Sequence, residues 1–191
     1  MTNVTIFGNG NMGAAIDSVL SAGGASVDHI TTSNIGKPIT GEVVVLAVPH
    51  PAVAEITSQY GDQLAGKIVV DITNPLNMET FDGLVVPVGS SSAAELAAQL
   101  PSSRVLKAFN TNFAATLASK SVGPAKTTVL VAGDDEAAKT ALIDALVAGG
   151  VNGVDAGSLR RAHELEALGF LQIGLAGSGK ISWTGGFAFV E

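Results

Sequence analysis

Short apolar segments alternate with amphipathic segments along most of the chain, and this alternation predicts an α/β fold. The apolar segments carry few polar residues on either face, which is typical of strands in a parallel sheet that is covered on both sides. We expect strands over residues 4–7, 26–32, 43–48, 67–73, 104–109, 127–133 and 151–155. A shorter extended segment is expected over 84–88, and helical patterns occupy most of the intervals.

The intervals between strands differ in length. The first helix is expected over about 12–21, and a second begins at Pro51. Residues 33–41 are too few and too rich in glycine and proline for a full crossover helix, so one half of the sheet is abbreviated. Ser92 and Glu95 form a capping-box pattern that predicts a helix through about Gln99.

The last third of the chain contains the longest helical pattern, residues 158–176. Its leucines at 165, 168, 171 and 175 share one face, which we expect to be internal or shared with a second subunit. Residues 181–190 alternate like a strand. Trp183, the one tryptophan of the chain, is expected in the core, and a flat cofactor stacking on it is the alternative.

The first strand runs without a gap into a glycine-rich turn that opens a helix. In this context Gly8 permits the tight turn, Gly10 lets the backbone approach a pyrophosphate, and Gly13 allows the helix to pack closely. The helix N-terminus adds unpaired N–H groups and partial positive charge. We therefore predict a dinucleotide-binding turn formed by Gly8, Asn9, Gly10, Asn11, Met12 and Gly13.

The end of the second strand bears on which dinucleotide is bound. Proteins that bind NAD usually place an acid there, which binds the ribose hydroxyls. Thr31, Thr32 and Ser33 occupy that place here. Lys37 follows them, and the only acid close by, Asp28, lies earlier, inside the strand. Hydroxyls and a lysine suit a 2′-phosphate, so we expect NADP(H); the alternative is that these residues only turn the chain.

Three later strands end in small or amide-bearing residues, at the edge where ligands bind in such sheets. Ala47, Val48 and Pro49 close one strand and are either ligand contacts or a plain strand end. Asn74 and Asn110 close two others and are candidates for orienting a nicotinamide carboxamide, with turn roles as the alternative. His50, between two prolines, is expected to cap a helix or face solvent rather than to catalyse.

Composition narrows the classes of function. The chain has 191 residues, enough for one domain, and a net charge of −7 with scattered basic residues, which argues against nucleic acid. The absence of cysteine excludes disulfides and thiol chemistry. No apolar run reaches the roughly 18–20 residues that span a bilayer, and no signal-peptide pattern opens the chain. We therefore expect a cytoplasmic protein without a membrane partner.

Six segments occur in the order and form of a known family. They are GNGNMG at 8–13, AVP at 47–49, DITNPL at 71–76, SSAAELAAQLP at 91–101, RVLKAFNT at 104–111 and VDAGSLRRAHELEAL at 154–168. Together they resemble the NADPH-dependent F420 reductase family, also called F420H2:NADP oxidoreductases. The resemblance covers nearly the whole chain.

The resemblance implies a Rossmann-type, usually dimeric protein that carries hydride between NADP(H) and a deazaflavin. It adds Pro75 and Ala108 to the cofactor contacts already predicted from the residues. Two departures are visible: the family's Ser-Arg after the second strand is replaced by hydroxyl residues, and the C-terminal part has few basic residues for the acidic tail of F420. A flavin or another small acceptor therefore stays open.

We expect one domain over 1–191, a doubly wound, mostly parallel sheet with a nucleotide-binding core over about 1–156. A C-terminal helix and strand over 157–191 would serve the acceptor site or a dimer contact. Transfer of hydride between two stacked rings needs mainly position, so we expect no metal and no catalytic side chain. Besides an NADP-dependent oxidoreductase with a flat acceptor, acting as a homodimer, two functions stay open: an NADP(H) sensor without turnover, and an imine or hydroxyacid reductase.

Overall fold

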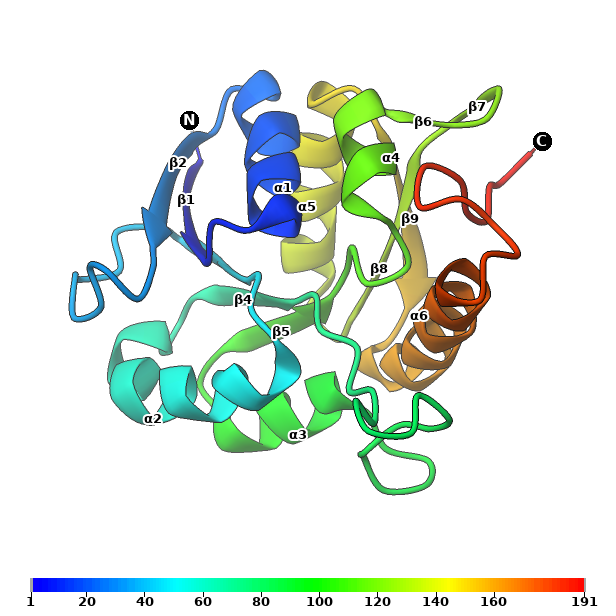
Figure 1. Ribbon diagram of the computed structural model, residues 1–191. Helices are drawn as coiled ribbons and strands as arrows, with labels where there is room; N and C mark the ends of the chain where they lie inside the picture. The colour runs from blue at the N-terminus through cyan, green and yellow to red at the C-terminus, as the bar shows by residue number, and fades with distance from the viewer. Residues whose placement is uncertain (1, 191) are drawn as a thin grey trace.

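Seven strands form one sheet in the order β2-β1-β3-β4-β5-β8-β9, and helices cover both of its faces (Figure 1). The computed structural model describes residues 2–190. The strands are β1 (Asn3–Phe7), β2 (Ser26–Ile30), β3 (Val43–Leu46), β4 (Ile68–Asp71), β5 (Arg104–Lys107), β8 (Thr128–Gly133) and β9 (Asn152–Gly157). A separate hairpin contains β6 (Ser121–Val122) and β7 (Ala125–Lys126).

Helices lie in two layers, with α1, α4 and α5 on one face of the sheet and α2 and α3 on the other (Figure 1). Their bounds are α1 (Asn11–Ala22), α2 (Val53–Leu64), α3 (Ser92–Gln99), α4 (Ala114–Ser119), α5 (Glu136–Ala148) and α6 (Ala162–Gly177). Two short 3-10 turns, η1 (His50–Ala52) and η2 (Leu159–Arg161), precede α2 and α6. Within residues 2–190, no helix has both the length and the apolar character needed to cross a bilayer.

The sheet is mostly parallel, as predicted. Strands β2, β1, β3, β4 and β5 run in one direction, while β8 pairs antiparallel with β5 and parallel with β9. The chain leaves β1 first toward β2 on one side and then returns to place β3 on the other. Such a reversal of strand order opens a crevice at the carboxyl ends of β1 and β3, where ligands bind in doubly wound folds.

Both faces of the sheet contribute to the core, which explains why the strands are apolar along their length. Ile6, Val45 and Val70 pack beneath α1 and α5, whereas Phe7 and Leu46 pack on the opposite side against α2. Each fully buried side chain of this size stabilises the fold by roughly 1.5–3 kcal/mol. Two-sided burial therefore holds the strand ends, and the loops that follow them, in fixed positions.

Several strands end earlier than the sequence pattern predicts. Strands β2, β3, β4 and β5 stop at Ile30, Leu46, Asp71 and Lys107, and the residues that follow turn out of the sheet. The expected extended segment over 84–88 is reduced to one isolated bridge between Leu76 and Leu84. The N-cap of α3 is Ser91, whose hydroxyl accepts the Ala94 N–H. The cap therefore lies one residue before Ser92, where the capping-box pattern had predicted it.

The strand predicted over 181–190 is wrong, because this segment forms turns and irregular backbone. Gly186 adopts φ +140° beside Gly185, and the aromatic rings of Phe187 and Phe189 are about half exposed. Two hydrogen bonds attach the segment to α6: the Ile181 N–H donates to the Leu175 carbonyl at 3.4 Å, and the Phe187 N–H donates to Oε1 of Gln172 at 2.9 Å. The alternation of aromatic residues resembles a strand pattern, but among the described residues the segment pairs with no strand of the sheet and therefore forms none.

Helix α6 buries a different face from the one that its leucines suggest. Its buried residues are Ala162, Leu165, Glu166, Gly169, Gln172 and Ala176, whereas Leu171 is 53% exposed. The leucine face, predicted to be internal or shared with a second subunit, is thus only partly buried within this chain. Polar Glu166 and Gln172 are accommodated inside because each finds hydrogen-bond partners from distant parts of the chain.

Candidate functional site

Two glycines of the 8–13 turn are required by close packing. Gly8 has φ +101°, and a Cβ there would lie 2.3 Å from the carbonyl oxygen of Ala47. A Cβ on Gly13 would lie 2.7 Å from the carbonyl oxygen of Gly8. Gly8 therefore permits the turn to pass against β3, and Gly13 permits α1 to pack on the turn.

Gly10 has the opposite surroundings. It is the N-cap of α1, no side chain caps the helix there, and no atom lies within 4 Å of the position that a Cβ would occupy. The first N–H groups of a helix lack partners within the helix, and they attract anions. Open space beside uncapped N–H groups is the arrangement that a pyrophosphate requires.

A pocket of about 530 Å³ lies at the ends of β1, β2 and β3, and we call it the β1–β3 pocket. Apolar side chains such as Phe7, Ile30 and Ile56 form part of its wall. Eight of the predicted contact residues line it: Gly8, Asn9, Gly10, Thr31, Thr32, Ala47, Val48 and Pro49.

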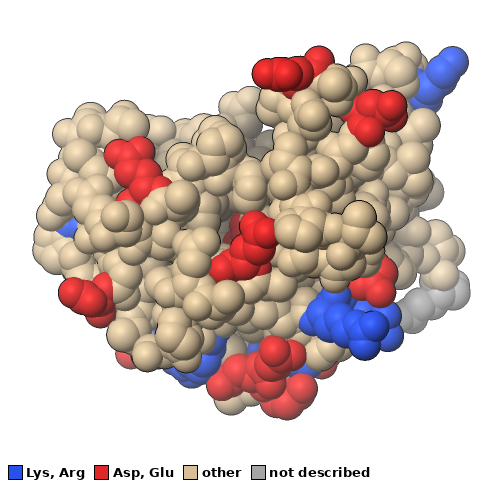
Figure 2. Space-filling model, turned by 90° about the horizontal axis from the view of Figure 1, so that it is seen from below, with Lys and Arg blue, Asp and Glu red and all other residues tan. Residues whose placement is uncertain are grey.

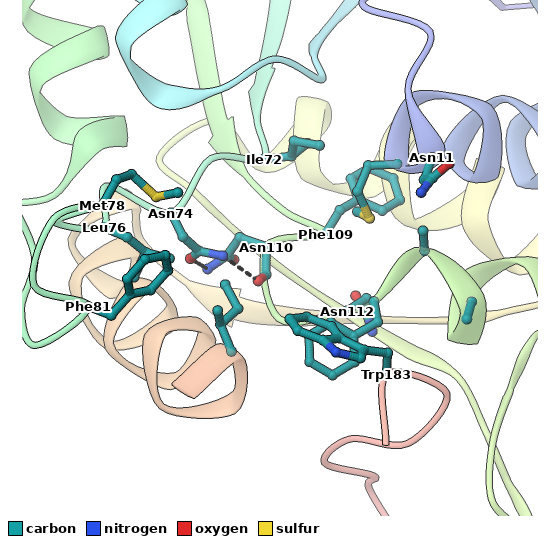
Figure 3. A pocket seen from close by; sticks show the side chains of 15 residues that line it. Asn11, Ile72, Asn74, Leu76, Met78, Phe81, Phe109, Asn110, Asn112 and Trp183 are labelled. Carbon is teal, nitrogen blue, oxygen red and sulfur yellow. Dashed lines mark hydrogen bonds between the residues drawn. The ribbon is translucent and has the colours of Figure 1, made fainter. Parts of the chain in front are cut away.

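A second pocket of about 590 Å³ lies beyond the ends of β4 and β5, and we call it the β4–β5 pocket (Figure 3). Four predicted residues line it: Asn11, Met12, Asn74 and Asn110. Because Gly8 to Gly10 line the first pocket and Asn11 and Met12 the second, the glycine turn lies between the two. An elongated ligand that crosses the turn would reach into both.

Asn74 and Asn110 hold each other in place on the floor of the β4–β5 pocket (Figure 3). Nδ2 of Asn110 donates to Oδ1 of Asn74 at 2.9 Å and to the carbonyl of Leu165 at 2.8 Å. Nδ2 of Asn74 donates to the Asn110 carbonyl at 2.9 Å. A side-chain amide has two N–H donors and two acceptor lone pairs, so half-buried Asn74 keeps one of each for a ligand.

A buried charge network supports these strand ends. Nζ of Lys107 lies 2.8 Å from Oδ2 of Asp71 and 2.7 Å from Oε1 of Glu166, and all three side chains are fully buried. Lys107 also donates to the Thr73 carbonyl at 2.5 Å. Glu166 in turn accepts the backbone N–H of Ser92 at the start of α3. One cluster of charges thus ties β4, β5, α3 and α6 together.

The two carboxyls of this network respond differently to burial. For Asp71, burial favours the neutral form, but the charge and hydrogen bonds of Lys107 and Thr73 outweigh it and lower the pKa. For Glu166, burial dominates over Lys107 and the Ser92 N–H, and it raises the pKa. Asp71 is therefore the carboxylate whose ionised form the network favours.

His29 on β2 links the glycine turn to α1 through the two nitrogens of its ring. Its Nδ1 lies 2.8 Å from the Gly8 carbonyl and its Nε2 lies 2.9 Å from Oδ2 of Asp17 on α1. Burial lowers the pKa of His29, but these two hydrogen bonds and the charges of Asp17 and Asp28 outweigh it and raise the pKa. Both ring nitrogens face acceptors, so the doubly protonated ring fits this position best.

Five of the predicted residues line neither pocket. Gly13, Pro75 and Ala108 are buried in support of the turn and the strand ends, and Ser33 lies beside Thr31 with the two hydroxyls 2.8 Å apart. Lys37 forms an ion pair of 2.5 Å with Asp28. An opposite charge at that distance competes with any phosphate for the lysine. His50 also lies outside both, with Nδ1 3.1 Å from the Ser92 hydroxyl.

Several residues of the β4–β5 pocket were not predicted as contacts. Trp183, expected in the core, is 53% exposed and forms part of the pocket wall with Phe113 (Figure 3). Phe81 and Phe109, two of the lining aromatics, adopt positive φ angles of 50° and 62°. Such strain costs roughly 1–3 kcal/mol for a residue other than glycine and is concentrated at functional sites. Nothing in the local sequence marks Phe81 and Phe109 as lining residues, whereas cofactor stacking on Trp183 was the alternative that the sequence left open.

Charges are dispersed over the face of the molecule that Figure 2 shows. In the face shown in Figure 2, small groups of basic and acidic residues are separated by uncharged surface, and the larger basic groups lie next to acidic ones. With a net charge of −7, the protein has no excess of cations to attract an anionic ligand from a distance. A phosphate bound here would therefore depend on local N–H groups and hydroxyls.

Comparison of the sequence with known proteins gives consistent matches. Residues 31–75 match the family described as NADP oxidoreductase, coenzyme F420-dependent. The chain is 34% identical over 161 residues to the F420-dependent NADP reductase of Methanocaldococcus jannaschii, covering 82% of this chain and 72% of that protein. It is 36% identical over 129 residues to the metalloreductase STEAP3 of Rattus norvegicus, covering 66% of this chain and 25% of that protein.

Solved structures show the same fold. A crystal structure from Arthrobacter sp. FB24, assigned as an F420-dependent NADP reductase, has a TM-score of 0.84 over 100% of both chains at 24% identity. A hypothetical protein from Sinorhizobium meliloti has a TM-score of 0.70 at 27% identity, covering 83% of this chain and 86% of that one. An imine reductase from Aspergillus terreus has a TM-score of 0.60 at 20% identity, and the likeness covers 69% of its chain.

Proposed function

The chain belongs to the family of F420-dependent NADP oxidoreductases, and we propose from its site how it carries out this activity. It is an NADP-dependent oxidoreductase. The observation that carries the identification is 34% identity extending over most of both this chain and the Methanocaldococcus reductase. The resemblance found from the sequence motifs is confirmed by this match.

We infer that NADP(H) lies across the glycine turn, with its adenosine half in the β1–β3 pocket and its nicotinamide half in the β4–β5 pocket. The open space at Gly10 and the uncapped start of α1 fit the pyrophosphate. Thr31 and Thr32 line the β1–β3 pocket where the 2′-phosphate would lie. Lys37 remains a candidate only if the phosphate displaces Asp28 from it.

In the nicotinamide half, Asn74 is the residue best placed to orient the ring. It retains one N–H and one acceptor, which complement a primary carboxamide. Asn110 fixes Asn74 and thereby fixes the carboxamide. When bound, NADPH supplies a hydride from its nicotinamide ring, and the protein contributes alignment and exclusion of water.

We propose that the acceptor is a flat redox ring, deazaflavin F420 or a flavin, bound in the β4–β5 pocket next to the nicotinamide. The pocket has a volume of about 590 Å³ and its walls are largely apolar. The direct test is to follow the absorbance of NADPH with deazaflavin, flavin, quinone and imine acceptors in turn. We expect oxidation with deazaflavin or flavin. Oxidation with imine alone would identify an imine reductase, and tight binding without oxidation would identify a sensor.

Cofactor preference has its own test in Thr32, which is exposed and lines the β1–β3 pocket. The change Thr32→Asp introduces a carboxylate that repels a 2′-phosphate and accepts ribose hydroxyls. We expect the ratio of NADPH affinity to NADH affinity to fall at least about tenfold, or 1.4 kcal/mol. An unchanged ratio would remove Thr32 from the phosphate site.

We further propose that the protein acts in the cytoplasm as a homodimer and does not bind nucleic acid. The cysteine-free, acidic composition supports the first and last of these. Partly exposed apolar residues on α6, such as Leu171 at 53% exposure, support the dimer. Light scattering of the purified protein tests the dimer directly, and a monomer at micromolar concentration would contradict it.

A further inference from the structure

The walls of the β4–β5 pocket lack charge. Among the described residues, the 15 that line it include no acidic and no basic side chain (Figure 3). Its polar groups are neutral amides, and its outer wall carries Met78, Phe81 and Trp183, each more than half exposed. Large apolar side chains are normally covered by a partner or a ligand when several of them gather in one place.

Trp183 belongs to the irregular segment after α6, and the structure holds it against the pocket at two points. Its ring packs on Phe113, with the ring centroids 4.9 Å apart and the planes inclined by 57°. The buried amide of Gln172 donates to the Thr111 carbonyl at 3.0 Å and accepts the Phe187 N–H at 2.9 Å. The segment is thereby attached to the loop that follows β5, which also contributes Asn110 and Phe113.

We propose that the pocket binds its acceptor as an uncharged planar ring stacked on the exposed part of Trp183, and that an anionic tail adds nothing to the affinity. This proposal rests on the proposed function, transfer of hydride to a flat acceptor. The ring takes two electrons with the hydride from the reduced nicotinamide, leaving NADP⁺, and a proton from solvent completes the reduced acceptor.

Within residues 2–190, the lining of the pocket offers no cationic side chain to a buried anion. An anionic group that loses water without gaining a cationic or N–H partner is strongly disfavoured. The net charge of −7 adds a weak repulsion at long range. The basic residue nearest to Trp183 in the sequence is Lys180, which is exposed, follows α6 and lies outside the pocket lining. An aromatic ring, by contrast, gains contact area and stacking on Trp183.

The fluorescence of Trp183 can report ligand binding at this site, because it is the one tryptophan in the chain. Riboflavin and flavin mononucleotide share one ring and differ by a phosphate, so each is titrated against tryptophan fluorescence with NADP⁺ present. We expect dissociation constants within about threefold of each other at low and high salt. The pair of deazariboflavin and oligoglutamyl F420 is titrated in the same way. Tighter binding of the anionic partner by tenfold, lost at high salt, would overturn the proposal.

The stacking role is tested with Trp183→Ala and a matched control, Phe189→Ala. Both rings are 53% exposed in the same segment, but only Trp183 lines the pocket. We expect Trp183→Ala to raise the KM for riboflavin or deazariboflavin about tenfold, with an unchanged dissociation constant for NADPH. Phe189→Ala should leave both values unchanged, and Trp183→Phe should restore most of the loss.

The outcomes separate the two proposals. If none of the flat acceptors supports oxidation of NADPH by the wild-type protein, the proposed function fails. If the wild-type protein oxidises NADPH with a flat acceptor but Trp183→Ala has the wild-type KM for it, the function stands and the stacking role of Trp183 is wrong. A loss of folding in Trp183→Ala, visible in circular dichroism, leaves Trp183→Phe and the fluorescence titration of the wild type to decide.

Discussion

At the scale of single residues, the glycines of the 8–13 turn divide into two classes. Gly8 and Gly13 are enclosed by backbone atoms, whereas the side of Gly10 that would carry a Cβ faces open space. Glycine is needed for the fold at positions 8 and 13. At position 10 it is needed only if a ligand fills the open space. The distinction separates a structural turn from a binding turn.

The change Gly10→Ala tests this directly. The added methyl group contacts no protein atom, so we expect an unchanged melting temperature. It occupies the space assigned to the pyrophosphate, so NADPH should bind at least about tenfold more weakly, measured by calorimetry. Gly13→Ala is the comparison, since its methyl would lie 2.7 Å from the Gly8 carbonyl and should lower stability. Unaltered NADPH affinity in Gly10→Ala would contradict the assignment.

His29 predicts a pH dependence of stability. Its pKa is raised in the folded protein, so folding favours the protonated ring. The stabilisation is complete below the ordinary pKa of about 6.5 and is lost as the pH rises through the raised pKa of the folded state. We expect His29→Gln to cost about 1 kcal/mol in free energy of unfolding at pH 6 and less at pH 8.5.

Urea unfolding at the two pH values measures this difference between wild type and variant. Asp17→Asn provides the control, because it removes the carboxylate that lies 2.9 Å from Nε2 of His29. In that background the effect of pH on the His29 substitution should shrink. A cost of His29→Gln that is the same at both pH values would show that the ring does not titrate as proposed.

At the scale of elements, α6 sets the position of the amide pair in the β4–β5 pocket. A Cβ on Gly169 would lie 2.5 Å from Oδ1 of Asn74 and 2.8 Å from the Asn110 carbonyl. The helix approaches the strand ends this closely because position 169 has no side chain. On the same helix, no atom lies within 4 Å of a Cβ placed on Gly174.

Gly169→Ala and Gly174→Ala form a matched pair. Both gain helix propensity of up to about 1 kcal/mol, so Gly174→Ala should raise the free energy of unfolding and leave kinetics unchanged. Gly169→Ala must displace Asn74 or shift the helix, at a cost of roughly 1–3 kcal/mol. We expect it to raise the KM for NADPH severalfold. Equal stabilisation and equal kinetics in the two variants would show that α6 does not position Asn74.

At the scale of the whole molecule, one buried charge network joins elements that are distant in the sequence. Lys107, Asp71 and Glu166 lie on β5, β4 and α6, and Glu166 reaches the start of α3. Removing the cation leaves two buried carboxyls without their common partner. Loss of one partner from a buried ion pair typically costs 3–5 kcal/mol.

We expect Lys107→Met to lower the free energy of unfolding by about 3–5 kcal/mol. Lys139→Met is the matched control, because Lys139 is also buried, but the side chains of its partners Asp155 and Glu136 are 44% and 79% exposed. Water can solvate those carboxylates, so the cost should be near 1 kcal/mol. Denaturant titration measures the free energy of unfolding of the two variants. Equal losses would contradict the proposal that the buried network holds these elements together.

Patterns along the chain were enough to predict the alternation of strands and helices, the glycine turn and the absence of an acid at the end of the second strand. Each of these depends on neighbours along the chain, through side-chain periodicity and backbone conformation. The mostly parallel sheet followed from strands that are apolar along their whole length. The motifs also indicated the family, which the comparison with the Methanocaldococcus reductase shows.

The construction of the β4–β5 pocket, by contrast, depends on contacts between residues that are far apart in the sequence. The Asn110 amide meets the Leu165 carbonyl 55 residues away, and Lys107 meets Asp71 36 residues away. Polar side chains such as Glu166 are buried only because such distant partners satisfy them, and local pattern cannot report that. Trp183 is a similar case: its exposure depends on how the last segment packs against Phe113, rather than on the residues beside it.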